Sequence, residues 1–157
     1  LKRIKQFYPE TFDRILLDPP CSALGLRPKL FVVQETLEDL EKYANFQKKF
    51  VGEAVALLKP GGFMTYSTCT INSAENEVMV RHILDVYPCL ELLPINCTLG
   101  RPGLSGFGLL DAERDKVRRF DPHDEEADTM GFFVALFRKC EQIMYLADDP
   151  CLERIVN

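Results

Sequence analysis

The sequence predicts an α/β domain with a largely parallel sheet, and two features lead to this fold class. Short apolar segments alternate with longer segments in which apolar residues recur at helical spacing. The resulting order, strand–helix–strand–helix–strand with helices as crossovers, is typical of parallel sheets, because the chain must return along the sheet before it can add another parallel strand.

Residues 12–17 are apolar at Phe12 and along Ile15-Leu16-Leu17, which predicts a short buried strand of a parallel sheet. Residues 22–33 contain glycine and proline and are expected to form a loop. From about Thr36 to Leu58 the apolar residues follow a helical period. The segment Lys59-Pro60-Gly61-Gly62 should end that helix, because proline and glycine both discourage its continuation.

Residues 63–67 predict the next strand. Ser73 is the expected N-cap of a second helix that runs to about Tyr87. Glu75 and Glu77 would then lie in its first turn, where acidic side chains favour the positive end of the helix dipole.

The remaining chain predicts two more strands and an irregular segment. Residues 90–94 form a candidate short strand, and residues 95–130, first glycine-rich and then charged, are expected to be irregular. The aromatic and aliphatic run at residues 131–137 predicts the final strand. The tail, residues 141–157, is a candidate helix of unknown role.

The composition narrows the class of protein. With 157 residues and 46% hydrophobic content, the chain is expected to form one globular domain or a large piece of one, and Leu1 at its start suggests residues upstream. No apolar run reaches the ~18 residues that span a bilayer, so no membrane partner is expected. None of the six cysteines forms a CxxC pair, which argues against a zinc site. The chain is not a short disulfide-rich secreted one either, so reduced thiols inside the cell are expected, in the cytoplasm or else the nucleus.

The net charge of −5 gives no overall basic surface for nucleic acid. Residues 1–30 nevertheless carry more basic than acidic side chains, whereas residues 31–99 carry more acidic ones. A phosphate-bearing partner near the first strand and a chance imbalance explain this distribution equally well.

Two predicted strands end in a thiol. Asp18-Pro19-Pro20-Cys21 follows the first strand, and Thr68-Cys69 follows the second. Ligands of open α/β sheets bind beyond the carboxyl ends of the strands, and neighbouring strands lie ~4.8 Å apart. If these two strands are neighbours, both thiols face one pocket. The other four cysteines are expected to be small buried apolar residues.

These segments resemble the signatures of the Nop/Sun-domain RNA cytosine-5 methyltransferases. The resemblance rests on Asp18-Pro19-Pro20-Cys21-Ser22, Tyr66-Ser67-Thr68-Cys69-Thr70, Ser73-Ala74-Glu75-Asn76-Glu77, and Arg119-Phe120-Asp121-Pro122-His123 followed by Gly131-Phe132-Phe133. It covers residues 12 to about 140. It implies a Rossmann-like sheet, mostly parallel with a final antiparallel strand, of which residues 1–140 form the C-terminal part.

The resemblance also assigns chemical roles. Carbon 5 of cytosine is a poor nucleophile, so a thiolate adds to carbon 6 and forms an enamine that attacks the methyl group of S-adenosyl-L-methionine. By resemblance, Cys69 is that nucleophile and Cys21 assists product release. Asp18 would contact the target cytosine near N3 and N4, beside the cofactor, although a loop-capping role remains open. The implied partner is RNA, expected to be tRNA or rRNA with mRNA as a further candidate, and no metal is implied.

Two further residues have more than one possible role, and two positions depart from the family pattern. Arg27 either approaches the substrate or lies on an ordinary surface, and His123 either supports the site or packs. Ala23 follows Cys21-Ser22 where the family more often has glycine, and Met130 stands where it usually has aspartate. The chain contains no glycine-rich cofactor turn, so the resemblance places that half upstream of residue 1 and leaves residues 15–17 as an exposed sheet edge.

Three other functions compete with this one. The chain could be a truncated, non-catalytic fragment that acts at most as an interaction module. An exocyclic-amine methyltransferase would carry an aromatic residue where Cys21 stands. A DNA cytosine-5 methyltransferase would use the Cys21 thiol as its nucleophile and would leave Cys69 without a role.

Overall fold

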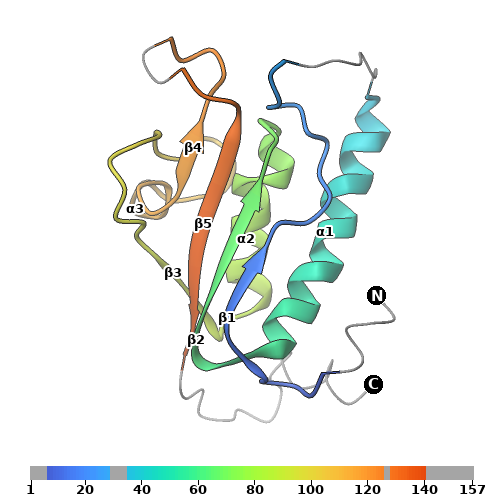
Figure 1. The fold of residues 1–157 in the computed structure, drawn as a ribbon, viewed down its shortest axis with the longest axis vertical. Coiled ribbons are helices and arrows are strands. Elements are labelled where there is room, and N and C mark those ends of the chain that lie inside the picture. The colour runs from blue at the N-terminus through green and yellow to red at the C-terminus, as the bar shows by residue number, and fades with distance from the viewer. Residues whose placement is uncertain (1–6, 29–34, 126–127, 141–157) are drawn as a thin grey trace.

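The computed structural model describes residues 7–28, 35–125 and 128–140, which form a sheet covered by helices. Its strands lie in the order β1-β2-β5-β3, and β4 pairs with β5 as well (Figure 1). The strands are β1 (Phe12–Leu17), β2 (Leu58–Thr68), β3 (Leu90–Leu93), β4 (Arg118–Phe120) and β5 (Phe132–Lys139). The helices are α1 (Leu37–Leu57), η2 (Ser73–Glu75), α2 (Glu77–Val86) and α3 (Asp111–Arg114).

The strand directions confirm the expected sheet. β1 and β2 pair in parallel, whereas β5 runs antiparallel to β2, β3 and β4. Four strands therefore point one way and the last strand points the other way. Because β5 lies between β2 and β3, most of the hydrogen-bonded pairs are antiparallel even though most strand directions agree.

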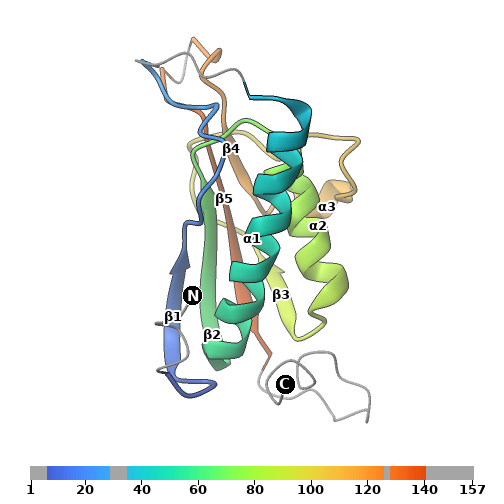
Figure 2. The same cartoon turned by 90° about the vertical axis from the view of Figure 1, so that its right-hand side faces the viewer.

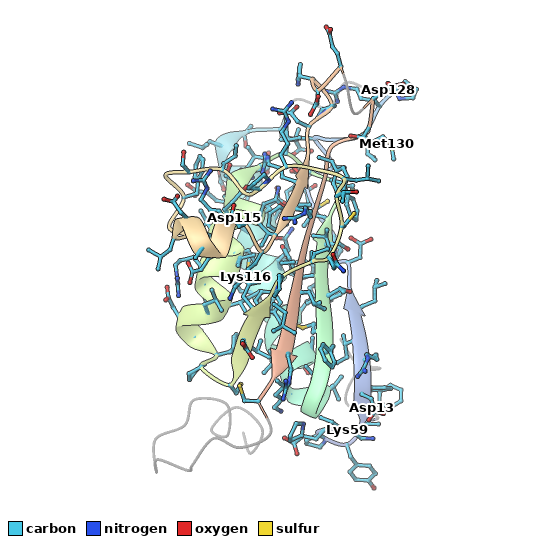
Figure 3. The ribbon with its side chains drawn as sticks, turned by 90° about the vertical axis from the view of Figure 1, so that its left-hand side faces the viewer. Asp13, Lys59, Asp115, Lys116, Asp128 and Met130 are labelled. Carbon is cyan, nitrogen blue, oxygen red and sulfur yellow. The ribbon has the colours of Figure 1, made fainter. Side chains whose placement is uncertain are left out.

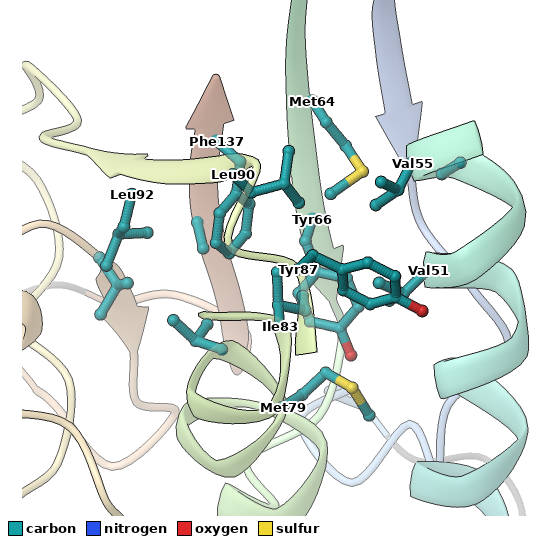
Figure 4. Close-up of a cluster of buried hydrophobic side chains, with 14 of the residues drawn as sticks. Val51, Val55, Met64, Tyr66, Met79, Ile83, Tyr87, Leu90, Leu92 and Phe137 are labelled. Carbon is teal, nitrogen blue, oxygen red and sulfur yellow. The ribbon is translucent and has the colours of Figure 1, made fainter. Parts of the chain in front are cut away.

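The long helices α1 and α2 cover one face of the sheet (Figure 2). The core lies between them and strands β2, β5 and β3 (Figure 4). Val51 and Val55 of α1 meet Met64 and Tyr66 of β2 there, and all four side chains are nearly inaccessible to solvent. Burial of one such side chain contributes about 1.5–3 kcal/mol to folding.

The first helix matches the predicted one. Thr36 and Asp39 form a reciprocal capping box at its start. It ends at Leu57, and Leu58 already has an extended backbone, so the helix stops within one residue of the predicted end. Gly61, further along in β2, has a φ of 75° that suits glycine. β2 begins five residues before the predicted strand, at Leu58, because the segment before Phe63 already runs beside β1 with a shifted register.

The predicted N-cap of the second helix is wrong. Asn72, not Ser73, accepts a hydrogen bond from the Ala74 amide, and only a short 3-10 turn follows. The α-helix begins at Glu77, since Asn76 leaves the helical backbone conformation. The side chain of Asn76 bonds instead to the loop after β2, and this interaction interrupts the helix.

β1 is not the buried strand that its apolar sequence predicts. Within the described residues it pairs only with β2, and the Leu16 side chain is 78% exposed. This agrees with the open sheet edge that the resemblance implied. Arg14, Leu16 and Phe63 line a shallow hollow on the face of the sheet away from the long helices.

The expected short strand at residues 90–94 and the final strand are both confirmed, as β3 and β5. The segment 95–130 is less irregular than predicted, because it contains α3 and β4. The tail, residues 141–157, lies outside the described residues. None of the described helices is long and apolar enough to cross a membrane.

Candidate active site

The thiols of Cys21 and Cys69 meet at the carboxyl ends of two neighbouring strands. Because β1 and β2 are parallel, the loops that follow them leave the sheet at the same edge. The two sulfur atoms lie 3.3 Å apart, and both side chains are partly accessible to solvent. The condition on which the sequence argument depended, that these two strands are neighbours, is therefore met. Two cysteines that are 48 residues apart in sequence form one dithiol.

Gly25 and Gly131 bring three chain segments together at this edge. The Gly25 amide donates to the Cys69 carbonyl at 3.0 Å, and the Gly131 amide donates to the Gly25 carbonyl at 2.8 Å. A Cβ atom on Gly25 would lie 2.7 Å from the Gly131 Cα, a distance that no side chain tolerates. Met130 and Asp128 lie at this same end, opposite the Asp13–Lys59 pair (Figure 3).

Ala23 adopts a backbone conformation that suits glycine. Its φ is 53°, in the left-handed region, where a Cβ atom costs roughly 1–2 kcal/mol. The loop after Cys21 needs this turn so that the Gly25 amide reaches the Cys69 carbonyl. The turn gives a physical reason why glycine is favoured at the position of Ala23.

Three consecutive residues after the second cysteine, Glu75, Asn76 and Glu77, hold the surrounding loops. All three are fully buried. Asn76 accepts a hydrogen bond from the Thr68 hydroxyl at 2.6 Å and donates to the Thr70 carbonyl at 2.9 Å, so it binds the chain on both sides of Cys69.

The sequence placed Glu75 and Glu77 in a first helical turn and did not predict their burial. Glu75 lies in the short turn η2 and Glu77 in the first turn of α2, but both side chains are fully buried. The available signal was that Asn76 precedes Val80 and Ile83 by four and seven residues, which puts it on the apolar face of the helix.

Arg119 is a second residue whose role the sequence did not reveal. Its guanidinium lies 3.1 Å from both carboxylate oxygens of Glu77, and the two side chains are 7% and 0% exposed. The same guanidinium donates a short hydrogen bond to the Ile71 carbonyl, two residues after Cys69. Arg119 therefore links β4 to the loop that carries Cys69.

Asp18 lies at the same edge as the dithiol. It directly follows β1, is exposed, and accepts a hydrogen bond from the Ser67 hydroxyl at 3.3 Å. Arg27 is exposed and donates to the carbonyls of Leu24 and Leu26. His123 does not pack in the core, since its side chain is 77% exposed and contacts Asp121.

The environment keeps Cys21 protonated. Burial is the largest contribution that raises its pKa, from an ordinary 9.0 to about 12. The hydrogen bond and charge of the Cys69 side chain raise it further, whereas the backbone amides of Ala23 and Cys69 lower it. Cys21 is therefore a thiol at neutral pH and can donate its proton toward the Cys69 sulfur.

This pKa predicts how fast Cys21 reacts with iodoacetamide. A thiol with the ordinary pKa of 9.0 has reached most of its maximal rate by about pH 10. The Cys21 rate should still be rising there, and Cys69→Ala should move the rise to lower pH, because two of the contributions that raise the pKa disappear. The rate of alkylation of the Cys21 peptide, followed by mass spectrometry, tests this. An unchanged pH profile in Cys69→Ala would contradict the coupling of the two thiols.

The site shows no sign of a metal centre in the described part of the chain. Among residues 7–28, 35–125 and 128–140, no three His, Cys, Asp or Glu side chains gather to hold a metal ion. Cys21 and Cys69 are both free cysteines. The site presents two adjacent thiols with a carboxylate at the same edge.

Comparison with known proteins identifies the family. A family model described as 16S rRNA methyltransferase RsmB/F matches residues 1–138. The rRNA (cytosine-C(5))-methyltransferase NOP2C of Arabidopsis thaliana is 47% identical over 141 residues, covering 83% of this chain and 23% of that protein. The tRNA (cytosine(72)-C(5))-methyltransferase of Pyrococcus horikoshii is 40% identical over 131 residues, covering 83% of this chain and 30% of that protein.

A solved structure agrees with these relatives. The crystal structure of NSun6 from Pyrococcus horikoshii with SFG matches with a TM-score of 0.73 and 36% identity, covering 90% of this chain and 33% of that one. The chain thus spans about a quarter to a third of the length of these proteins. The expected resemblance and fold class are confirmed, and the chain belongs to the RsmB/F family, together with the cytosine-C5 RNA methyltransferases that it matches.

Proposed function

We propose that this chain is the thiol-bearing part of an S-adenosyl-L-methionine-dependent RNA cytosine-5 methyltransferase, in which residues 1–140 form the C-terminal part of the catalytic domain. The observation that carries the proposal is the 3.3 Å separation of the Cys21 and Cys69 sulfurs at the carboxyl edge of the sheet. Methyl transfer through a covalent adduct needs one sulfur to attack the ring and a second group to assist release. The dithiol supplies both.

Cys69 is the proposed nucleophile. Its loop is held on both sides by Asn76 and by the Gly25 amide, so its sulfur has a defined position for attack on carbon 6. Attack forms a carbon–sulfur bond and moves the electron pair of the C5–C6 double bond toward carbon 5. S-adenosyl-L-methionine, when bound, supplies the methyl group that carbon 5 then accepts.

Cys21 is the proposed residue for release. Its neutral thiol can donate a hydrogen bond to the Cys69 sulfur before attack. Release removes the proton from carbon 5, re-forms the C5–C6 double bond and breaks the carbon–sulfur bond, whose electron pair leaves with the Cys69 sulfur. Cys21, once it has given its own proton to solvent water, is the proposed acceptor of the carbon 5 proton.

Asp18 is the proposed contact for the cytosine ring and for the cofactor beside it. Its carboxylate is exposed at the edge where the dithiol lies, and among the described residues the Ser67 hydroxyl donates a hydrogen bond to it. An accessible carboxylate fits an amino group or a positively charged group. The described residues provide no glycine-rich turn for the rest of a cofactor, so Asp18 supplies one side of the pocket.

The proposed substrate class follows from the relatives, whose names specify tRNA and rRNA, with mRNA as a further candidate. The proposed location is the cytoplasm or the nucleus, since reducing compartments keep two adjacent thiols free. A runner-up function is an interaction module without activity of its own, which the exposed β1 edge and the hollow beside Leu16 favour.

A chimera tests the proposal. Residues 1–138 replace the matched segment of the P. horikoshii tRNA methyltransferase, and methyl transfer to the tRNA of that enzyme is measured. We expect the chimera to be active and Cys69→Ala to abolish transfer, with Cys97→Ala as the matched control that keeps it. Transfer that survives Cys69→Ala would overturn the assignment. Binding of S-adenosyl-L-methionine to the 157-residue chain, measured by calorimetric titration, would exclude the interaction module, whereas no binding would mean that the cofactor site needs further parts of the catalytic domain.

A further inference from the structure

Glu75 is a fully buried carboxylate that accepts four hydrogen bonds from neutral groups. The Ser22 hydroxyl and the Asn72 side-chain amide donate to Oε1 at 2.5 and 3.0 Å. The Gln47 side-chain amide and the Ser22 backbone amide donate to Oε2 at 2.8 and 3.1 Å. In the described part of the chain no basic side chain forms an ion pair with Glu75, so neutral donors alone compensate for its burial.

These donors come from both loops that carry a thiol. Ser22 directly follows Cys21, and its hydroxyl also lies 2.8 Å from that of Thr70, which directly follows Cys69. The backbone amide of Asn72 donates to the Thr70 hydroxyl at 3.2 Å. Because the Ser22 proton points at Glu75, the bonds run in one direction, from Asn72 through Thr70 and Ser22 to the carboxylate.

The helix α1 completes this arrangement through Gln47. Its side-chain amide donates to the Pro20 carbonyl at 3.1 Å as well as to Glu75. The backbone is therefore held on both sides of Cys21, at the Pro20 carbonyl and at the Ser22 amide. Gln47 is itself fully buried, four residues before Val51 on the buried face of α1.

The second buried carboxylate nearby has a different environment. Glu77 is paired with Arg119 and accepts a bond from the Leu104 amide, and none of these partners belongs to the Cys21 loop. Besides the Ser67–Asp18 bond and the thiol pair, the Glu75 network thus supplies the side-chain contacts that join one thiol loop to the other. A carboxylate suits this place because it accepts several bonds at once and donates none.

We propose that Glu75 is the positioning residue that sets the separation of the two thiols, by holding the Cys21 and Cys69 loops together. Its consequence for catalysis rests on the proposed function, because only then does the placement of Cys21 control product release. Its geometric effect does not depend on that function. Glu75→Gln keeps the shape of the side chain but turns an amide toward two of the four donors, so the two loops should separate.

The first experiment measures how readily Cys21 and Cys69 form a disulfide in the 157-residue chain equilibrated with oxidised and reduced glutathione. Two thiols are oxidised to one disulfide while one glutathione disulfide is reduced to two glutathione thiols. The linked peptides are quantified by mass spectrometry. Glu75→Gln should lower the equilibrium constant at least about tenfold, as expected when well-placed groups lose their orientation.

Glu77→Gln is the matched control, since it also converts a buried carboxylate to an amide. It should change the constant less than about threefold, because Arg119 still reaches the Ile71 carbonyl. Ser22→Ala is a milder variant that removes one donor and should lower the constant by a smaller factor, so the proposal stays testable if Glu75→Gln does not fold. Equal equilibrium constants in wild type, Glu75→Gln and Ser22→Ala would overturn the proposal that Glu75 holds the two loops together.

The second experiment uses the chimera and separates this proposal from the proposed function. Glu75→Gln should increase the fraction of enzyme trapped as a covalent RNA adduct, because a displaced Cys21 slows release, whereas Glu77→Gln should not. Suppose that Glu75→Gln lowers the equilibrium constant for disulfide formation but traps no adduct. The positioning role of Glu75 would then stand, and the role of Cys21 in release would be contradicted. An unchanged disulfide equilibrium constant in Glu75→Gln would overturn the positioning role of Glu75, whatever the activity of the chimera.

Discussion

Replacing Cys21 by alanine is expected to trap the enzyme on its RNA as a covalent adduct that survives denaturing electrophoresis. The Cys69 sulfur can still attack carbon 6, but it leaves only after the proton on carbon 5 has been removed. A positioned acid–base group accelerates such a step by roughly 10²–10⁴-fold. Without the thiol that lies 3.3 Å from the Cys69 sulfur, release should slow by a comparable factor, and adduct should accumulate.

The measurement is made in the chimera with its tRNA and S-adenosyl-L-methionine, and the shifted protein band is quantified over time. Cys69→Ala and the double variant should give no adduct, because the attacking sulfur is gone. A Cys21→Ala chimera that turns over normally without adduct would exclude Cys21 from release. An adduct that forms in Cys69→Ala and not in Cys21→Ala would reverse the two roles.

Arg119→Met is expected to lower the free energy of unfolding strongly. The substitution removes the partner of Glu77 and leaves a carboxylate with no exposed surface unpaired. Breaking a buried ion pair in this way costs about 3–5 kcal/mol, a large part of the roughly 5–15 kcal/mol that stabilises a domain. Urea denaturation of the 157-residue chain, followed by circular dichroism, measures the change in the free energy of unfolding.

Two further variants make this test specific. Adding Glu77→Gln to Arg119→Met should recover part of the loss, because a neutral amide costs less to bury and its oxygen can still accept from the Leu104 amide. Lys59→Met breaks the exposed pair with Asp13 (Figure 3) and should cost less than about 1 kcal/mol. A loss in Arg119→Met no larger than that in Lys59→Met would refute the buried pair as a major contribution.

Several local features follow from the sequence because they depend on neighbouring residues. The helix from Leu37 to Leu57 begins at a capping box and ends before a proline and two glycines. Each of these signals lies within a few residues of the helix end that it marks. The final strand is equally local, since its aromatic and aliphatic run favours an extended chain. The positions of Cys21 and Cys69 after strands could be predicted for the same reason.

Other features depend on contacts that sequence patterns do not reveal. Glu75 and Glu77 satisfy the local rule for a first helical turn, yet both are fully buried, and their side chains bind Ser22 and Arg119, which are distant in the sequence. β1 has the composition of a buried strand, but its burial depends on which strands lie beside it. Short-range sequence patterns carry no information about the distant residues that bind these glutamates or about the strands that lie beside β1.

The sequence by itself determined the alternation of strands and helices, the two thiols at strand ends and the family of the chain. Only the tertiary structure decided that those thiols lie in contact and that Glu75 joins their loops. The physical reason is distance along the chain. Propensity and capping act over a few residues, whereas Ser22 and Glu75 are 53 residues apart and meet only because β1 and β2 pair in parallel.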